Sequence, residues 1–224
     1  MIRMKKYFFA LLAAGLLLAG CGGRVDRLQT GDLIFIGIPA DYGNGGSMAD
    51  AIGAATGKGE LNLIHVAIAE VDEAGEPWVI DATIKHGVDR HPLDTMLRDF
   101  RLRNGQKANF IVKRLKRSRG VGRYVENAKE YLGRSYNTTF LPNDTSLYCS
   151  ELVQRSYVTL GGKELFREVP MNWRDADGEL PEYWVKLFAS LGMEVPEGLP
   201  GTNPQEMSEE PVLKATKVKI DQPY

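Results

Sequence analysis

The strongest constraint on the fold is a pair of apolar segments separated by a short polar turn. The segments run from Leu63 to Val71 (LIHVAIAEV) and from Trp78 to Ala82 (WVIDA), and the turn between them contains Gly75. Apolar segments of this length, joined by a short glycine-containing turn, are typical of an antiparallel hairpin. The nearly continuous apolar run from Leu33 to Ile38 predicts another buried strand. The sequence therefore predicts a small antiparallel sheet.

Helices are predicted where apolar residues recur at the spacing of one helical face. The clearest covers residues 121–132, and Gly133 follows it as a stop signal. Ser47 is a suitable N-cap for a helix over residues 47–56. Further helices are predicted over residues 94–100, 149–160 and 182–191, and further short strands over residues 88–90, 109–115 and 218–220. The sheet and helices together indicate an α+β protein.

The start of the chain indicates export rather than a part of the fold. Arg3, Lys5 and Lys6 precede fourteen uncharged residues, Tyr7 to Gly20, which is the pattern of a secretory signal. This run is short for a membrane span, which needs roughly 20 residues. We therefore expect a signal peptide over residues 1–20 that the mature protein lacks.

The signal ends in LAGC, which is similar to the lipobox of bacterial lipoproteins, whose cysteine thiol is the acyl acceptor. We expect lipidation of Cys21, a lipidated tether over residues 21–30, and attachment to a membrane of the bacterial cell envelope. Gly22 follows the cysteine, and in lipoproteins of this kind a residue other than aspartate favours the outer membrane, facing the periplasm. An ordinary signal peptide with a chance cysteine is the alternative.

Composition narrows the function classes. The 28 basic and 29 acidic residues give a net charge of −1, so no nucleic-acid partner is expected. Cys149 is the only cysteine besides Cys21, so it has no partner for a disulfide within its own chain. In an oxidising compartment, such a cysteine is read as a reactive thiol or an intermolecular pair. A buried structural cysteine is the alternative.

The neighbours of Cys149 favour the reactive thiol. The cysteine begins a predicted helix, and the backbone N–H groups and dipole at a helix N-terminus favour the thiolate over the thiol. A nucleophile also needs a base. His86 and His91 lie in a charged, loop-like segment, whereas His65 lies in an otherwise apolar strand, where a polar group needs a partner or a purpose. We therefore pair Cys149 with His65.

A carboxylate is expected to orient His65. Glu70 is close in sequence, but side chains alternate along a strand, so Glu70 points to the face opposite His65. Asp81 is the one charged residue inside WVIDA, on the partner strand of the hairpin, and is better placed. The alternative is that Asp81 caps a strand end or binds a loop amide. The cysteine and histidines lack the spacing of a metal site, so no metal and no other cofactor is predicted.

These residues lie in segments that resemble one family, the YaeF/YiiX-like proteins, which are circularly permuted members of the NlpC-type papain-like superfamily. The stretches that carry the resemblance are TGDLIF at 30–35, HVAIAE at 65–70, VIDAT at 79–83, GRSYNTTF…YCSELV at 133–153, and the tail-like GTNPQEMSEEPVL at 201–213. Ordinary papain-like enzymes have the cysteine helix first and the histidine strand later. Here the order is reversed, as the family's permutation requires.

The resemblance implies a permuted papain-like fold with a small antiparallel sheet packed against the helix that carries the cysteine. It implies a catalytic core over residues 31–165, and the Pro-, Gly- and acid-rich residues 166–224 are expected to form a C-terminal extension packed on it. Cys149 would be the nucleophile, His65 would activate it, and Asp81, where the family more often has glutamate, would orient His65. Tyr136 matches the family's tyrosine and could donate a hydrogen bond in the oxyanion region beside the N–H of Cys149. A packed core aromatic is the alternative role for Tyr136.

The expected activity is that of a lipid-anchored cysteine peptidase or amidase that hydrolyses its substrate through a thioester on Cys149. Amide bonds of cell-wall peptides are the first expected substrates. Lipid acyl chemistry in a hydrophobic pocket is one alternative, and a non-catalytic binding lipoprotein is another. A polar, acidic cleft would favour a peptide, and an apolar cleft would favour an acyl chain.

Overall fold

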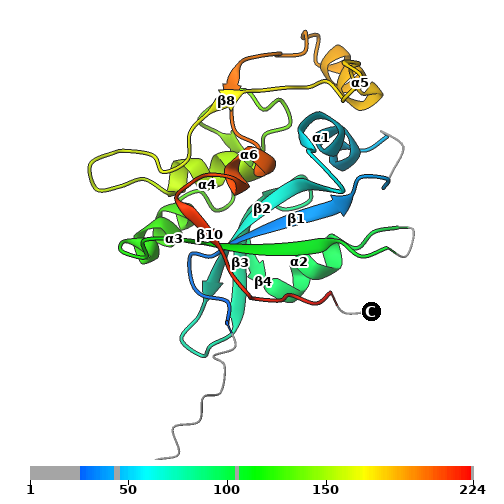
Figure 1. Ribbon diagram of the computed structural model, residues 1–224. Coiled ribbons are helices and arrows are strands. Elements are labelled where there is room, and N and C mark those ends of the chain that lie inside the picture. Colours follow the sequence, from blue (N-terminus) through cyan, green and yellow to red (C-terminus); the bar gives the residue numbers. More distant parts are fainter. Residues whose placement is uncertain (1–25, 43–45, 104–105, 223–224) are drawn as a thin grey trace, which may run out of the picture.

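An antiparallel sheet of six strands forms the centre of the molecule, with the order β10-β5-β1-β2-β3-β4. The computed structural model describes residues 26–42, 46–103 and 106–222 (Figure 1). The expected cleavage and lipidation at Cys21 lie outside these residues. The strands of the sheet are β1 (Leu33–Pro39), β2 (Leu61–Val71), β3 (Pro77–Thr83), β4 (Gly87–Pro92), β5 (Asn109–Leu115) and β10 (Leu213–Ala215). The predicted hairpin is β2 and β3, and it is confirmed.

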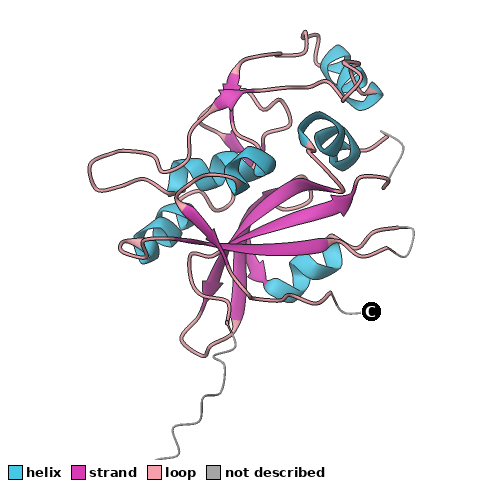
Figure 2. Ribbon diagram, in the orientation of Figure 1, coloured by secondary structure: helices cyan, strands magenta, loops and turns pink. Residues whose placement is uncertain are grey.

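Helices pack on both faces of the sheet (Figure 2). They are α1 (Met48–Thr56), α2 (Leu93–Asp99), α3 (Val121–Lys129), α4 (Cys149–Ser156), α5 (Glu182–Ser190) and α6 (Pro204–Ser208). Two small ladders complete the fold: β6 (Ser135–Tyr136) pairs with β7 (Ser146–Leu147), and β8 (Val169–Pro170) pairs with β9 (Pro200–Gly201). Within the described ranges, every helix is too short or too polar to span a lipid bilayer.

Strand β1 explains why two cores form. Leu33 and Phe35 point to the face covered by α3 and α4, while Ile34 and Ile36 point to the face covered by α2. All four side chains are buried, and burial on both faces of the strand explains why its sequence is an uninterrupted run of apolar residues. A third cluster, of aromatic side chains, lies under α1 and α5; it includes Phe140, Tyr148, Trp173, Trp184 and Phe188.

The N-terminus of α1 is determined locally by its sequence. Ser47 Oγ accepts the Asp50 N–H, and the Asp50 carboxylate accepts the Ser47 N–H, each at 3.2 Å. This reciprocal pair is a capping box, which satisfies backbone donors that a helix start leaves free. The predicted N-cap is confirmed.

Two predicted helices end three or more residues early, and one predicted strand is misplaced. The helix predicted over 121–132 ends at Lys129. The helix predicted over 149–160 ends at Ser156, because the wholly buried Tyr157 leaves the helical conformation and donates its hydroxyl to the Gly31 carbonyl at 3.1 Å. The edge strand predicted over 218–220 is wrong: the sheet's edge strand is β10, which pairs with β5. Val218 and Ile220 instead pack half-buried on the α2 face.

Candidate active site

A local irregularity in β2 sets the position of His65. The pairing of β1 with β2 shifts so that Ile36 lies opposite His65 while Gly37 lies opposite Leu63. Ile64 is therefore the extra residue of a β-bulge. Bulges bend a strand and re-aim side chains, and they are common beside active sites. His65 shares the sheet face of Ala67, toward α2.

Asp81 holds the buried histidine, as strand alternation and the hairpin predicted. Its Oδ2 lies 2.8 Å from His65 Nε2, and the two side chains are 0% and 7% exposed. The Phe100 ring packs against the imidazole, with ring centroids 4.7 Å apart. The imidazole is therefore held both at its edge and on its face. With Nε2 bonded to Asp81, Nδ1 is the ring nitrogen left for a second partner.

That second partner is Cys149, the first residue of α4, which is buried with 3% exposure. Burial alone lowers the pKa of His65, but the charge and hydrogen bond of Cys149 and the Asp81 carboxylate raise it to about 10. A histidine with this pKa is an imidazolium at neutral pH. The arrangement thus places a charged imidazole ring beside Cys149 at the N-terminus of α4, where backbone N–H groups can stabilise negative charge.

Tyr136 lies at the same site. It is half-buried in β6 and lines a cavity together with His65. Burial and the nearby charge of Cys149 raise the pKa of Tyr136 well above its ordinary value. The phenol therefore stays protonated and can donate a hydrogen bond, as an oxyanion donor must. Its ring also packs edge-on against Phe140 at 6.3 Å, so the packing role is present as well.

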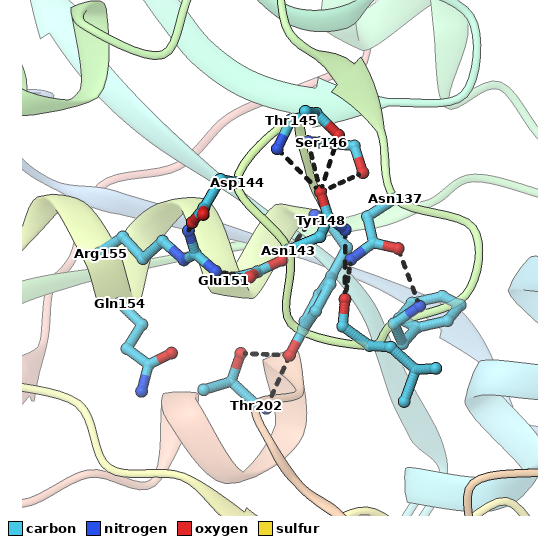
Figure 3. A network of polar contacts seen from close by, with 12 residues as sticks. Asn137, Asn143, Asp144, Thr145, Ser146, Tyr148, Glu151, Gln154, Arg155 and Thr202 are labelled. Atoms are coloured by element: carbon cyan, nitrogen blue, oxygen red, sulfur yellow. Dashed lines mark hydrogen bonds and ion pairs between the residues drawn. The ribbon is translucent and has the colours of Figure 1, made fainter.

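The residues that flank Cys149 are tied to the C-terminal part of the chain, and Figure 3 shows one of them, Tyr148, beside Thr202. The Thr202 N–H donates to the Tyr148 hydroxyl at 3.0 Å, and the Thr202 hydroxyl bonds Ser150 Oγ at 3.0 Å. Gly201 approaches so closely that an added Cβ would lie 2.7 Å from Met171 and 3.2 Å from the Tyr148 hydroxyl. The segment 201–204 (GTNP) therefore contacts both neighbours of Cys149, Tyr148 and Ser150.

The loop before α4 is fixed by side-chain amides. Asn143 Oδ1 accepts hydrogen bonds from Thr145 and from Ser146, through backbone and hydroxyl groups alike (Figure 3). Asn137 similarly accepts the Phe140 N–H at 3.1 Å. These short-range bonds are Asx turns, which order a loop without regular secondary structure. They set the position from which α4 begins.

Two cavities adjoin the pair of Cys149 and His65. The larger, of about 260 Å³, lies beside His65, and its apolar lining comprises Met48, Ala49, Ile52, Ile64, Ala82, Ile84 and Phe100. Its charged lining residues, Lys85 and Asp99, pair with each other at 2.6 Å. The smaller, of about 30 Å³, lies beside Cys149 and is walled by Phe140, Met171, Trp173 and Trp184. The surroundings of the site are therefore mainly apolar.

The sequence prediction missed one buried residue at the site. His91 was expected in a loop-like segment, but it lies in β4 with 7% exposure, and its Nε2 is 3.8 Å from Asp81 Oδ1. The cross-strand pairing of Asp81 with Asp89 and of Val79 with His91 brings it there. Because β4 carries charged residues on both faces, its sequence does not indicate that His91 is buried. The burial of His91 follows from the pairing register of β3 with β4.

Comparison with known families gives one match that spans most of the chain. Residues 27–217 match the family described as a permuted papain-like amidase enzyme, YaeF/YiiX, C92 family. This match confirms the resemblance seen in the sequence and the permuted papain-like fold it implied.

Two relatives agree with that match. The chain is 25% identical to the uncharacterized protein YiiX of Escherichia coli K12, over 83% of this chain and 84% of YiiX. The crystal structure of the metalloprotein YiiX from Escherichia coli O157:H7 superposes with a TM-score of 0.65 and 24% identity, over 87% of this chain and 98% of that one. The described residues of the present chain contain no cluster of three or more His, Cys, Asp or Glu side chains that could hold a metal ion.

Proposed function

Because the chain belongs to the YaeF/YiiX family of permuted papain-like amidases and is thus a cysteine hydrolase, we propose that Cys149 attacks an amide bond whose substrate carries an apolar group. The observation that carries this proposal is the buried line of Cys149, His65 and Asp81, with 2.8 Å between the histidine and the carboxylate. A nucleophile, a base and an orienting group in contact are the parts that acyl transfer requires.

In the first step, Cys149 Sγ as thiolate attacks the amide carbonyl carbon, and the carbonyl oxygen becomes an oxyanion. The N–H of Cys149 and the protonated hydroxyl of Tyr136 are its proposed donors. The imidazolium of His65 then gives its Nδ1 proton to the amide nitrogen. The C–N bond breaks, the amine leaves, and the acyl group remains on sulfur as a thioester.

In the second step, neutral His65 removes a proton from water, which attacks the thioester carbonyl. The C–S bond breaks, a carboxylic acid is released, and the thiolate and imidazolium are restored. Throughout, the Asp81 carboxylate accepts a hydrogen bond from the Nε2–H of His65, which keeps Nδ1 directed at the reacting atoms. Each proton taken up by His65 is thus returned within one turnover.

The cavities support an apolar substrate group. Apolar side chains dominate both linings, and the charges of Lys85 and Asp99 compensate each other. Of the two expected substrate classes, these surroundings favour an acyl amide with an apolar chain. Cell-wall peptides are the second candidate, because Lys85 and Asp99 place charges of both signs in the lining of the larger cavity, where peptide termini could bind.

Incubation of the purified protein with fatty acyl amides, fatty acyl esters and purified peptidoglycan fragments tests the substrate class. We expect an acyl-enzyme on Cys149, detected by mass spectrometry, with the acyl amide in preference to the peptide fragments. Cys149→Ala is the matched control and should form none. Turnover of the peptide fragments alone would replace the apolar substrate with the peptide, and no adduct from any of them would favour a binding lipoprotein.

We also propose that Cys21 is lipidated and holds the protein at the outer membrane, facing the periplasm. The basic start and the LAGC ending support this, and two acyl chains give stable anchoring where one gives marginal binding. Cys21→Ser should release the protein from membranes into the soluble fraction. Membrane retention of that variant would contradict the lipid anchor.

A further inference from the structure

Beyond the proposed triad, a second histidine lies behind the orienting carboxylate. Both ring nitrogens of His91 and Asp81 Oδ1 are buried without a hydrogen-bond partner among the described residues. His91 Nε2 lies 3.8 Å from Asp81 Oδ1, and its Nδ1 lies 3.6 Å from Asp89 Oδ2. These separations exceed a hydrogen bond, which joins nitrogen and oxygen at about 2.7–3.2 Å. His91 Nε2 and Asp81 Oδ1 thus face each other, and His91 Nδ1 faces the Asp89 carboxylate. In each pair the two atoms are slightly too far apart for a hydrogen bond.

Buried polar groups in folded proteins are almost always hydrogen-bonded, because leaving them unpaired costs free energy. A ring movement of about 1 Å would bring Nε2 and Oδ1 within bonding distance. We infer that His91 is a positioning residue of the proposed amidase, whose Nε2–H donates to Asp81 Oδ1 while Oδ2 remains bonded to His65. This inference rests on the proposed function, since it assigns His91 a role through Asp81.

The consequence is that Asp81 is held between two imidazoles, one on each oxygen. A carboxylate bonded on one oxygen can turn about its last side-chain torsion, which is broad and soft. Bonding the second oxygen removes that freedom, so the His65 ring keeps its direction toward Cys149. The titratable and charged groups that face His91 are Asp81, Asp89 and His86, whose ring centroid is 5.7 Å away.

Two polar variants of His91 separate this role from simple packing. His91→Gln places an amide donor near the former Nε2, and His91→Asn places one near the former Nδ1. The probe is the rate of Cys149 alkylation by iodoacetamide, which needs no knowledge of the substrate. It is measured at about pH 6, where an ordinary thiol is almost wholly protonated and reacts slowly, and at about pH 9.5, where an ordinary thiol ionises by itself.

We expect the Gln variant to react within about twofold of the wild type at both pH values. The Asn variant should react about fivefold more slowly near pH 6, the effect of one hydrogen bond, and within about twofold near pH 9.5. Glu70→Gln is the control and should change neither rate, because the Glu70 carboxylate pairs with Arg90 and Lys129 and not with His65 or His91. Thermal unfolding of each variant verifies that it is folded.

Equal rates for the Gln and Asn variants near pH 6, whether both normal or both slow, would overturn the role of His91. A wild-type thiol that reacts only after denaturation would overturn the proposed amidase mechanism together with it. If the wild-type thiol is alkylated in the folded protein and both His91 variants react at the wild-type rate, only the inference about His91 is overturned. The two failures are therefore distinguishable.

Discussion

Asp81 and Glu70 lie on the same hairpin, and each is a largely buried carboxylate, but they point to opposite faces. Glu70 is bonded by Arg90 at 2.6 Å and by Lys129 at 2.7 Å, one cation on each oxygen. Asp81 has a histidine bonded to one oxygen and a second histidine near the other. Burial by itself raises the pKa of Glu70, but its hydrogen bonds and charge interactions with Lys129 and Arg90 lower it.

The difference lies in the partners and not in burial. Arg90 and Lys129 stay charged through the physiological range, so Glu70 forms a fixed ion pair that joins the sheet to α3. In the proposed mechanism His65 changes its charge during proton transfer, so Asp81 would stabilise a charge that is present in only part of the reaction cycle. A buried carboxylate paired with a titratable ring therefore indicates an active site more strongly than one paired with permanent cations.

The largest expected effect comes from Asp81→Asn. An amide can hold the imidazole in the wrong tautomer, so turnover of an amide substrate should fall by about 10²- to 10⁴-fold while the fold is retained. Glu70→Gln is the matched control and should leave turnover within about twofold. A larger loss in the Glu70 variant than in the Asp81 variant would reverse the comparison.

The next effect concerns the pKa of His65. Cys149 is the largest of the influences that raise it, so Cys149→Ala should shift the pKa downward from about 10. An NMR titration of the His65 ring measures it. An unchanged pKa would mean that the thiolate does not contribute, and Asp81 would then act alone.

The same shift predicts how stability changes at alkaline pH. A histidine pKa raised from 6.5 to about 10 by folding contributes stability that is complete below the unfolded value and is lost as pH rises toward 10. Denaturant unfolding between about pH 6.5 and pH 10 should show this loss, and Cys149→Ala should reduce it. A flat profile in the wild type would contradict the raised pKa.

The smallest effect belongs to the fixed ion pair. Glu70→Gln should lower the free energy of unfolding at neutral pH by about 1–2 kcal/mol, as expected for a partly buried pair. Because folding lowers the pKa of Glu70, its contribution is present above the unfolded value and is lost as pH falls through the folded one. Urea unfolding of both proteins at neutral and acidic pH measures the difference, which should shrink in acid.

Local rules in the sequence were sufficient for part of the fold and site. Alternation along β2 and the hairpin turn placed Asp81, and not Glu70, beside His65, and the Ser47 cap needed only its own helix. The C-terminal half of the molecule was harder to predict. The end of α4 depends on Tyr157 reaching Gly31, far away in the chain, and no local pattern encodes that contact.

His91 and the edge strand show the same limit. Val218 and Ile220 alternate as a strand would, yet the edge of the sheet is taken by residues 213–215, because β5 pairs there. His91 is polar in a polar segment, and its burial follows from the register between β3 and β4. Features set by pairing between distant segments become visible only when the segments are placed together.

The position of Thr202 in the chain determines when the cysteine's surroundings can be completed. Cys149, His65 and Asp81 are all synthesised before it, yet Tyr148, Ser150 and the pocket beside the thiol obtain their final contacts only from Thr202 and its neighbours. A nascent chain, or one cleaved before residue 200, would contain Cys149, His65 and Asp81 but would lack the contacts that Thr202 makes with Tyr148 and Ser150.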